Sequence, residues 1–299
     1  MDLNEKNQRN QKNQRNQIDQ MNLSTPAPQQ TIIQPQSGWQ LINVRELLRY
    51  KDLFYFLVWK EVKVLYKQTV LGVSWAVIRP LFTMVIFSIV FGKLAKMPSD
   101  GAPYPIFAFV ALVPWTYFST AMTSSANSLI GNTNLLTKVY FPRLVIPMTP
   151  VLTGLVDFGI ALGLLTCMMG WFRMVPTWSV LFLPLLLLLM ICTAAGLGMW
   201  LSALAIQYRD IKYVVPFLSQ VLLYAAPVVW PVSLVPAQYR LMYGLYPMAG
   251  VIEGFRSALL GTNPMPWDLI AIGSLSTGML FLSGALYFRK MERVFADVA

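Results

Sequence analysis

Few side chains in the long apolar part of this sequence could carry out acid–base or metal chemistry. The 299-residue chain has no His and two Cys, Cys167 and Cys192, each of which lies within an apolar run. Without His, the usual general base and the commonest metal ligand are missing. We interpret the two Cys as small buried hydrophobic residues, so neither a metal site nor a catalytic triad is expected.

The remaining candidates for polar chemistry in the apolar region are two carboxylates, Asp157 and Glu253. Glu253 and Arg256 are three residues apart, so a helix brings them together on one face. A charge pair in an apolar segment favours a functional role, and a structural pair that pins the segment is an equal alternative. Asp157 is the one acid in its apolar run, so we expect a hydrogen bond to a neighbour and not a proton relay.

The sequence contains no G-x-x-x-x-G-K-[ST] motif for ATP. If ATP drives the protein, another chain must bind the nucleotide, and no cofactor is expected in this one. A membrane glycosyl or acyl transferase would need a His or a carboxylate cluster at the membrane surface. An ion-coupled secondary transporter would need paired charges near the membrane midplane and repeat symmetry. Neither pattern is present, and both classes are retained only as alternatives.

The elements that must position these residues are long apolar helices. Apolar types make up 56% of the chain and charged types 12%, and the charges fall mostly in short clusters between long apolar runs. A run of about 20 helical residues crosses the hydrocarbon layer of a membrane, whereas a soluble helical core would need charged outer faces. The sequence therefore predicts an all-α integral membrane protein with six transmembrane helices, at about residues 71–94, 104–129, 144–170, 178–206, 213–235 and 269–288.

Two segments precede the predicted transmembrane domain of residues 71–299. Residues 1–37 are rich in Asn, Gln and basic residues, which predicts a disordered tail. Residues 38–70 contain an amphipathic pattern that predicts a cytoplasmic helix at the membrane interface, with an ordinary surface helix as the alternative. The aromatic and basic residues expected to meet lipid are Trp59, Lys60, Lys63, Tyr66 and Lys67.

The distribution of Lys and Arg predicts the orientation. With the N-terminus inside, seventeen of them lie on the cytoplasmic side and five outside, leaving Arg79 aside. This pattern accounts for the net charge of +10 without nucleic acid. Leu241–Leu260 is apolar but contains Glu253 and Arg256, and a seventh span there would put the basic C-terminus outside. We therefore expect a re-entrant or interfacial hairpin on the outer side, at about residues 237–262.

Five stretches, in this order, resemble the permease subunits of type-2 ABC exporters for polysaccharides. They are WKEVK at 59–63 with YKQTVLGVSW at 66–75 and Pro80; VPW at 113–115 with Phe118; NLLTKVYFPR at 134–143; YRDI at 208–211; and PMAGVIEGFR at 247–256 with ALLG at 258–261. The resemblance extends from about Trp39 to the C-terminus. Each stretch alone is a weak signal, but five in the same order are specific.

The resemblance implies a homodimer of six-span subunits in the bacterial cytoplasmic membrane, with both termini in the cytoplasm. It also implies two separate ATPase subunits, which bind ATP and Mg²⁺, and a lipid-linked polysaccharide substrate of the O-antigen, capsule or teichoic-acid type. In such proteins the segment after the second span couples to the ATPase. The residues expected to couple here are Asn134, Leu135, Thr137, Lys138, Tyr140, Phe141 and Arg143, together with Arg209 and Asp210.

The outer hairpin is expected to act as a gate through Pro247, Glu253, Phe255 and Arg256. Flat aromatic faces suit the C–H surfaces of sugars, so aromatic residues in the spans could line a glycan path. The candidates are Trp75, Phe82, Phe87, Phe91, Trp115, Tyr117, Phe118, Tyr224 and Trp230. Helix packing and interfacial belts are the alternative for more than half of them.

Overall fold

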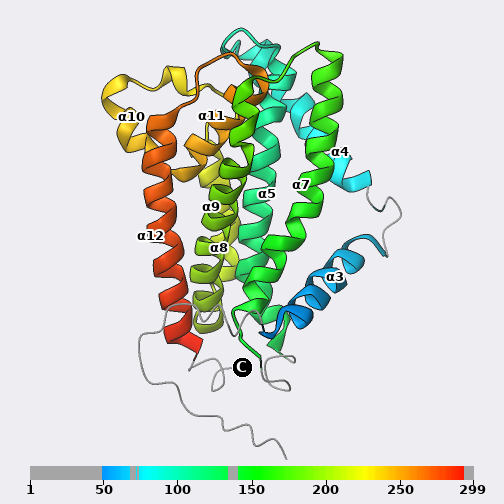
Figure 1. The fold of residues 1–299 in the computed structure, drawn as a ribbon, viewed down its shortest axis with the longest axis vertical. Helices are drawn as coiled ribbons and strands as arrows, with labels where there is room; N and C mark the ends of the chain where they lie inside the picture. The colour runs from blue at the N-terminus through cyan, green and yellow to red at the C-terminus, as the bar shows by residue number, and fades with distance from the viewer. Residues whose placement is uncertain (1–48, 68–71, 73, 134–140, 293–299) are drawn as a thin grey trace, which may run out of the picture. The chain divides into compact units, whose positions relative to one another are not determined.

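The computed structural model describes residues 49–67, 72, 74–133 and 141–292. Every regular element in these ranges is a helix (Figure 1). Five of the helical segments are long and apolar enough to cross a membrane. They are Ser74–Leu94, Tyr104–Gly131, Val145–Trp171, Trp178–Gln207 and Trp267–Glu292. The predictions for these five spans agree with the structure to within about three residues at most ends.

The amphipathic segment forms helix α3, Lys51–Lys67. The first apolar span consists of α4, Ser74–Phe87, and a π-helical continuation, Ser88–Leu94, with Pro80 inside α4. The start of the predicted interface segment and the whole of residues 1–37 lie outside the described part of the chain.

The centre of the bundle is built from three long helices. They are α5, Tyr104–Gly131; α7, Val145–Trp171; and α8, Leu183–Gln207, which follows a short 3₁₀ turn at Trp178–Phe182. Apolar residues surround all three helices, as expected for helices buried in a bundle or in a membrane. α5 lies innermost, and it contacts α4, α7, α8, α9 and α11.

The fifth predicted span differs from the structure. Helix α9 covers Ile211–Ala225, only 15 residues, and the following chain to Pro236 contains no α-helix. Ala226 is extended and precedes Pro227. A residue before proline disfavours helical geometry, which explains why α9 ends there although the apolar run continues.

The predicted outer hairpin is a pair of helices, α10, Ala237–Gly244, and α11, Pro247–Leu260. All 14 residues of α11 are buried, and Gly261 ends the helix in the left-handed conformation. Helix α12, Trp267–Glu292, then runs back along the bundle. In Figure 1 the hairpin lies at the end where α12 begins, and α3 lies toward the end where α12 finishes.

Candidate functional site

Helix α5 is buried around its circumference except along one narrow face. Between Ile106 and Leu129, six residues are not buried, and each carries a hydroxyl or an amide. These six residues, called the polar face below, are Thr116, Ser119, Thr120, Thr123, Ser124 and Asn127. Their spacing of three or four residues places them in one stripe. A polar stripe at membrane depth requires protein or water in front of it, because lipid cannot satisfy its hydrogen bonds.

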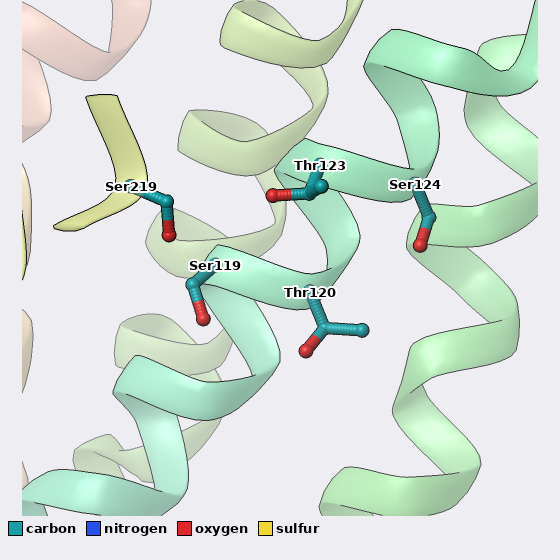
Figure 2. Close-up of a pocket in the computed structure, with 5 residues that line it drawn as sticks. All are labelled: Ser119, Thr120, Thr123, Ser124 and Ser219. Atoms are coloured by element: carbon teal, nitrogen blue, oxygen red, sulfur yellow. The ribbon is translucent and has the colours of Figure 1, made fainter. Parts of the chain in front are cut away.

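The polar face borders a hollow of about 230 Å³. Figure 2 shows Ser119, Thr120, Thr123 and Ser124 of α5 around it, with Ser219 of α9 on the opposite side. Within the part of the chain that the structure describes, the hydroxyls of Thr120, Thr123, Ser124 and Ser219 make no hydrogen bond. Serine and threonine in membrane helices often bond back to their own backbone. These four hydroxyls do not do so within the described residues, so they remain available to a ligand or to water.

Two helices that contact α5, namely α4 and α9, expose apolar and aromatic side chains and are called the rims below. Phe82 of α4 is 68% exposed, and Phe217 and Tyr224 of α9 are each 67% exposed. Both α4 and α9 contact α5. Helix α5 itself carries no charged residue. A hydrogen-bonding floor between apolar rims matches a sugar chain, which has hydroxyl groups and C–H faces.

Two cations lie near the ends of these rims. The guanidinium of Arg79 stands over the ring of Trp75 at 5.6 Å, and the ammonium of Lys212 lies 4.9 Å from the ring of Tyr213. Cation–π contacts of this kind contribute about 0.5–1 kcal/mol at exposed sites. Among the described residues no group of three or more acidic, Cys or His side chains could hold a metal ion.

The predicted pair in α11 forms the centre of a buried polar group called the outer cluster below. Arg256 Nη1 lies 3.3 Å from Glu253 Oε2, and both side chains are almost completely buried. Asn263 Nδ2 donates to Asp100 Oδ2 at 2.7 Å and to Glu253 Oε1 at 3.4 Å. The cluster therefore connects α11 with the loop before α5 and with the loop after α11.

Arg256 also holds the segment that follows α9. Nη1 donates to the carbonyl oxygen of Trp230 at 3.2 Å and Nη2 to that of Val228 at 2.8 Å. Its guanidinium carbon lies 3.6 Å from the centre of the Phe107 ring. The sequence spacing predicted the partner Glu253, but it contained no signal for Val228 and Trp230, which approach from a different segment.

A second apolar cluster lies at the end of the bundle where α12 finishes, and it is called the inner cluster below because the charge distribution predicts that this end faces the cytoplasm. Phe141 packs there with Leu129, Val145 and Phe288, and the start of α3 covers it through Phe54 and neighbouring residues. Arg143 Nη1 donates to the backbone oxygen of Glu292 at 2.6 Å, which ties the start of α7 to the end of α12.

The structure describes only some of the predicted coupling residues. Asn134, Leu135, Thr137, Lys138 and Tyr140 lie outside the described residues. Arg209 and Asp210 are exposed in the turn that leads into α9.

Some predicted interface residues of α3 are exposed, and one of them contacts α7. Lys60, Lys63 and Lys67 are exposed, and the ammonium of Lys63 lies 5.2 Å from the Trp59 ring. Tyr66, which the sequence placed among the residues of the interface helix, donates its hydroxyl to Asp157 Oδ1 of α7.

The predicted path-lining residues also separate into groups. Trp75, Phe82 and Tyr224 are exposed, as a lining residue must be. Phe87, Phe91 and Trp230 are half-buried. Trp115, Tyr117 and Phe118 are at most 5% exposed and belong to the apolar core, so they do not face the hollow. The reason is that α5 turns its large apolar residues inward and its small polar residues outward.

Sequence reasoning missed the polar face. Its signal was present in the recurrence of Ser, Thr and Asn at helical spacing within a span that is otherwise apolar. The predicted path-lining residues were all aromatic, so they did not include these polar side chains.

Comparison with known proteins identifies sequences similar to this one. The family described as ABC-2 type transporter matches residues 52–260. An O-antigen export system permease protein, RfbA, from Myxococcus xanthus is 29% identical over 252 residues, which covers 83% of this chain and 96% of that protein. An RfbA protein from Klebsiella pneumoniae is 25% identical over 248 residues, with 83% and 95% covered. The polysialic acid transport protein KpsM from Escherichia coli is 23% identical over 246 residues, with 78% and 91% covered.

Proposed function

Because this chain belongs to the ABC-2 type transporter family, we propose that it is the membrane subunit of an exporter for lipid-linked polysaccharide. Relatives that it matches over nearly their whole length are named for export of O-antigen and transport of polysialic acid. The observation that carries the proposal is the polar face of α5, because it gives hydroxyl and amide groups to a span that is otherwise apolar.

The polar face supports an export path between two copies of the chain. A single copy would expose six hydroxyl or amide side chains to lipid, which cannot hydrogen-bond to them. A second copy related by twofold symmetry would cover this face with its own, and a water-filled path would run between the two. The exposed aromatic residues of α4 and α9 would then lie at the borders of the path.

The path suits a glycan better than an ion. Sugar hydroxyls exchange hydrogen bonds with Ser and Thr side chains at little net free energy, which allows a long chain to slide. An ion-coupled transporter would require charged groups at mid-membrane, and α5 has none. The short helix α9 would complete a sixth crossing together with the extended residues after Ala225.

The energy for export would come from separate ATPase subunits that bind ATP and Mg²⁺ at the cytoplasmic side. Their docking element would be the segment 134–143, whose last residues, Phe141 and Arg143, are fixed by the inner cluster and by Glu292. Both termini would be cytoplasmic, as the distribution of basic residues predicts. The α10–α11 hairpin would then lie on the outer side and act as a gate held by the outer cluster.

The test is ATP-dependent export in proteoliposomes that contain this chain and its ATPase subunit. The double substitution Ser119→Leu with Thr123→Leu removes two hydroxyl groups from the polar face and adds apolar bulk. We expect the export rate to fall about tenfold or more, because the lost hydrogen bonds and the narrowed path act together. The measurement is the amount of glycan that reaches the far side of the membrane per unit time, determined by digestion with a glycosidase.

The matched control is Ser274→Leu on α12, where the serine is exposed and its hydroxyl bonds only to its own helix at 2.7 Å from Ala271 O. Export by this control should equal that of the unsubstituted protein. Equal export by the double variant and by the control would contradict the proposed path.

A further inference from the structure

Asp157 is the only charged residue in α5, α7 and α8. It lies 12 residues after the start of α7, which is about 18 Å along the helix. A carboxylate at this depth is retained only with a partner. The sequence predicted a hydrogen bond to a neighbour, and the partner in the structure is the phenol of Tyr66 on α3.

A second polar contact joins the same two helices. Thr153 Oγ1 donates to Glu61 Oε2 at 3.4 Å. Thr153 and Asp157 are one turn apart on α7, and Glu61 and Tyr66 are five residues apart on α3, so α3 contacts α7 at two successive levels along its length. Burial raises the pKa of the Glu61 carboxyl above its ordinary value, and burial together with Asp157 raises the pKa of the Tyr66 phenol.

The beginning of α3 is also fixed to protein. Leu53, Phe54 and Leu57 pack against the inner cluster, which includes Phe141. The opposite face of α3 exposes Tyr55, 70%, and Phe56, 60%. A helix that only floats at the membrane interface needs an apolar face and basic residues. It does not need a carboxylate from a membrane span, so the contacts to α7 serve to fix the position of α3.

We propose that Asp157 and Tyr66 form a positioning pair, which holds α3 along α7 so that Phe141 and the inner cluster transmit ATPase motion to the membrane helices. The proposal rests on the proposed export function for its consequence, but the geometry of the pair can be tested without transport. Neither residue touches the substrate in this account. Both act through α3, whose first turns pack on the inner cluster.

The first measurement is a distance between two spin labels. One label is attached at Lys63→Cys on the exposed side of α3 and the other at Gly159→Cys on α7, where a side chain meets nothing within 4 Å. Cys167 and Cys192 are first replaced by Ser. In the parent protein we expect one narrow distance distribution. Tyr66→Phe and Asp157→Ala should broaden it, because each removes one partner of the same hydrogen bond.

Two variants separate positioning from general damage. Asp157→Asn keeps an acceptor oxygen for the Tyr66 hydroxyl, so it should retain most of the narrow distribution. Tyr55→Phe removes a hydroxyl from an exposed tyrosine of the same helix and should change nothing.

The second measurement is glycan exported per ATP hydrolysed in proteoliposomes with the ATPase subunit. Tyr66→Phe should lower this ratio about fivefold, as expected from the loss of one hydrogen bond that holds the active arrangement, while ATP hydrolysis continues. A structural defect would lower both activities together. An unchanged label distance in both Tyr66→Phe and Asp157→Ala would overturn the proposal. If the parent protein exports no glycan, the proposed function fails, and the label distances still decide for or against the pair.

Discussion

Arg256 is the residue on which the contacts of the outer end converge. Its guanidinium meets Glu253, two backbone carbonyl oxygens and the ring of Phe107, and only 1% of the residue is exposed. Burying a charge without a partner costs several kcal/mol, so the four contacts together make this position tolerable. The same convergence means that Arg256 fixes three chain segments relative to one another.

Substitution of Arg256 should therefore destabilise the protein far more than loss of an exposed ion pair. Arg256→Ala leaves Glu253 buried and unpaired, and we expect the free energy of unfolding to fall by about 3–5 kcal/mol. Arg240→Ala removes a pair whose side chains are 42% and 37% exposed, and the expected loss is about 0–1 kcal/mol. The measurement is the unfolding of detergent-solubilised protein, followed by Trp fluorescence. Equal losses of unfolding free energy in the two variants would show that the outer cluster stabilises the protein no more than the exposed pair does.

Exchanging the charges of Glu253 and Arg256 distinguishes a cluster with several partners from an isolated ion pair. Spacing alone suggests that Glu253→Arg with Arg256→Glu would restore an ion pair. In the structure the exchange directs a carboxylate at the carbonyl oxygens of Val228 and Trp230, which are acceptors and repel it. The local sequence could predict the i, i+3 pair, but not the carbonyl partners, because their approach depends on how the chain after α9 returns to α11.

At the scale of elements, apolar runs indicated where helices form but not always how long they are. The ends of α5 and α7 agree with the predicted spans because polar or turn-forming residues bound these runs, whereas α12 continues four residues beyond the predicted end at Phe288. The fifth span was predicted too long, since hydropathy ignores the effect of Pro227 on the residue before it. The open face of α5 does have a signal in the sequence, the recurrence of Ser, Thr and Asn at helical spacing, but the mean hydropathy of the run does not reveal it.

Close packing of α8 on α12 depends on a glycine. A Cβ atom at Gly196 would lie 2.9 Å from backbone atoms of Leu280 and Phe281, and a backbone cannot move aside as a flexible side chain can. Small residues allow such approaches between membrane helices.

Gly196→Val should therefore force α8 and α12 apart and lower the free energy of unfolding by about 1–3 kcal/mol or more. The matched control is Gly163→Ala on α7, where an added Cβ meets nothing within 4 Å. Its effect should be small and could be slightly stabilising, because Ala favours helix. Thermal unfolding of both variants in the same detergent gives the comparison. A Gly196→Val protein as stable as the control would show that the helices tolerate a wider separation.

At the scale of the whole described chain, a polar contact holds each end of α12. Arg240 pairs with Asp268 in its first turn at 2.7 Å, and Arg143 binds the backbone of Glu292 at its other end. A continuous helix of 26 residues thus connects the α10–α11 pair with the segment proposed to meet the ATPase. The sequence predicted the membrane class and the family resemblance. It could not predict this connection, which requires knowledge of residues that are far apart in the chain.

Cysteine modification can determine whether the polar face of α5 lines the proposed export path. In a background with Cys167→Ser and Cys192→Ser, Thr123→Cys places a thiol beside the hollow, and Ser274→Cys places one on the exposed side of α12. A bulky thiol reagent is added to proteoliposomes, and ATP-dependent glycan export is measured before and after the reaction. The account predicts that modification of Thr123→Cys stops export, that excess glycan substrate slows the modification, and that modified Ser274→Cys exports normally. Full export by completely modified Thr123→Cys protein would contradict it.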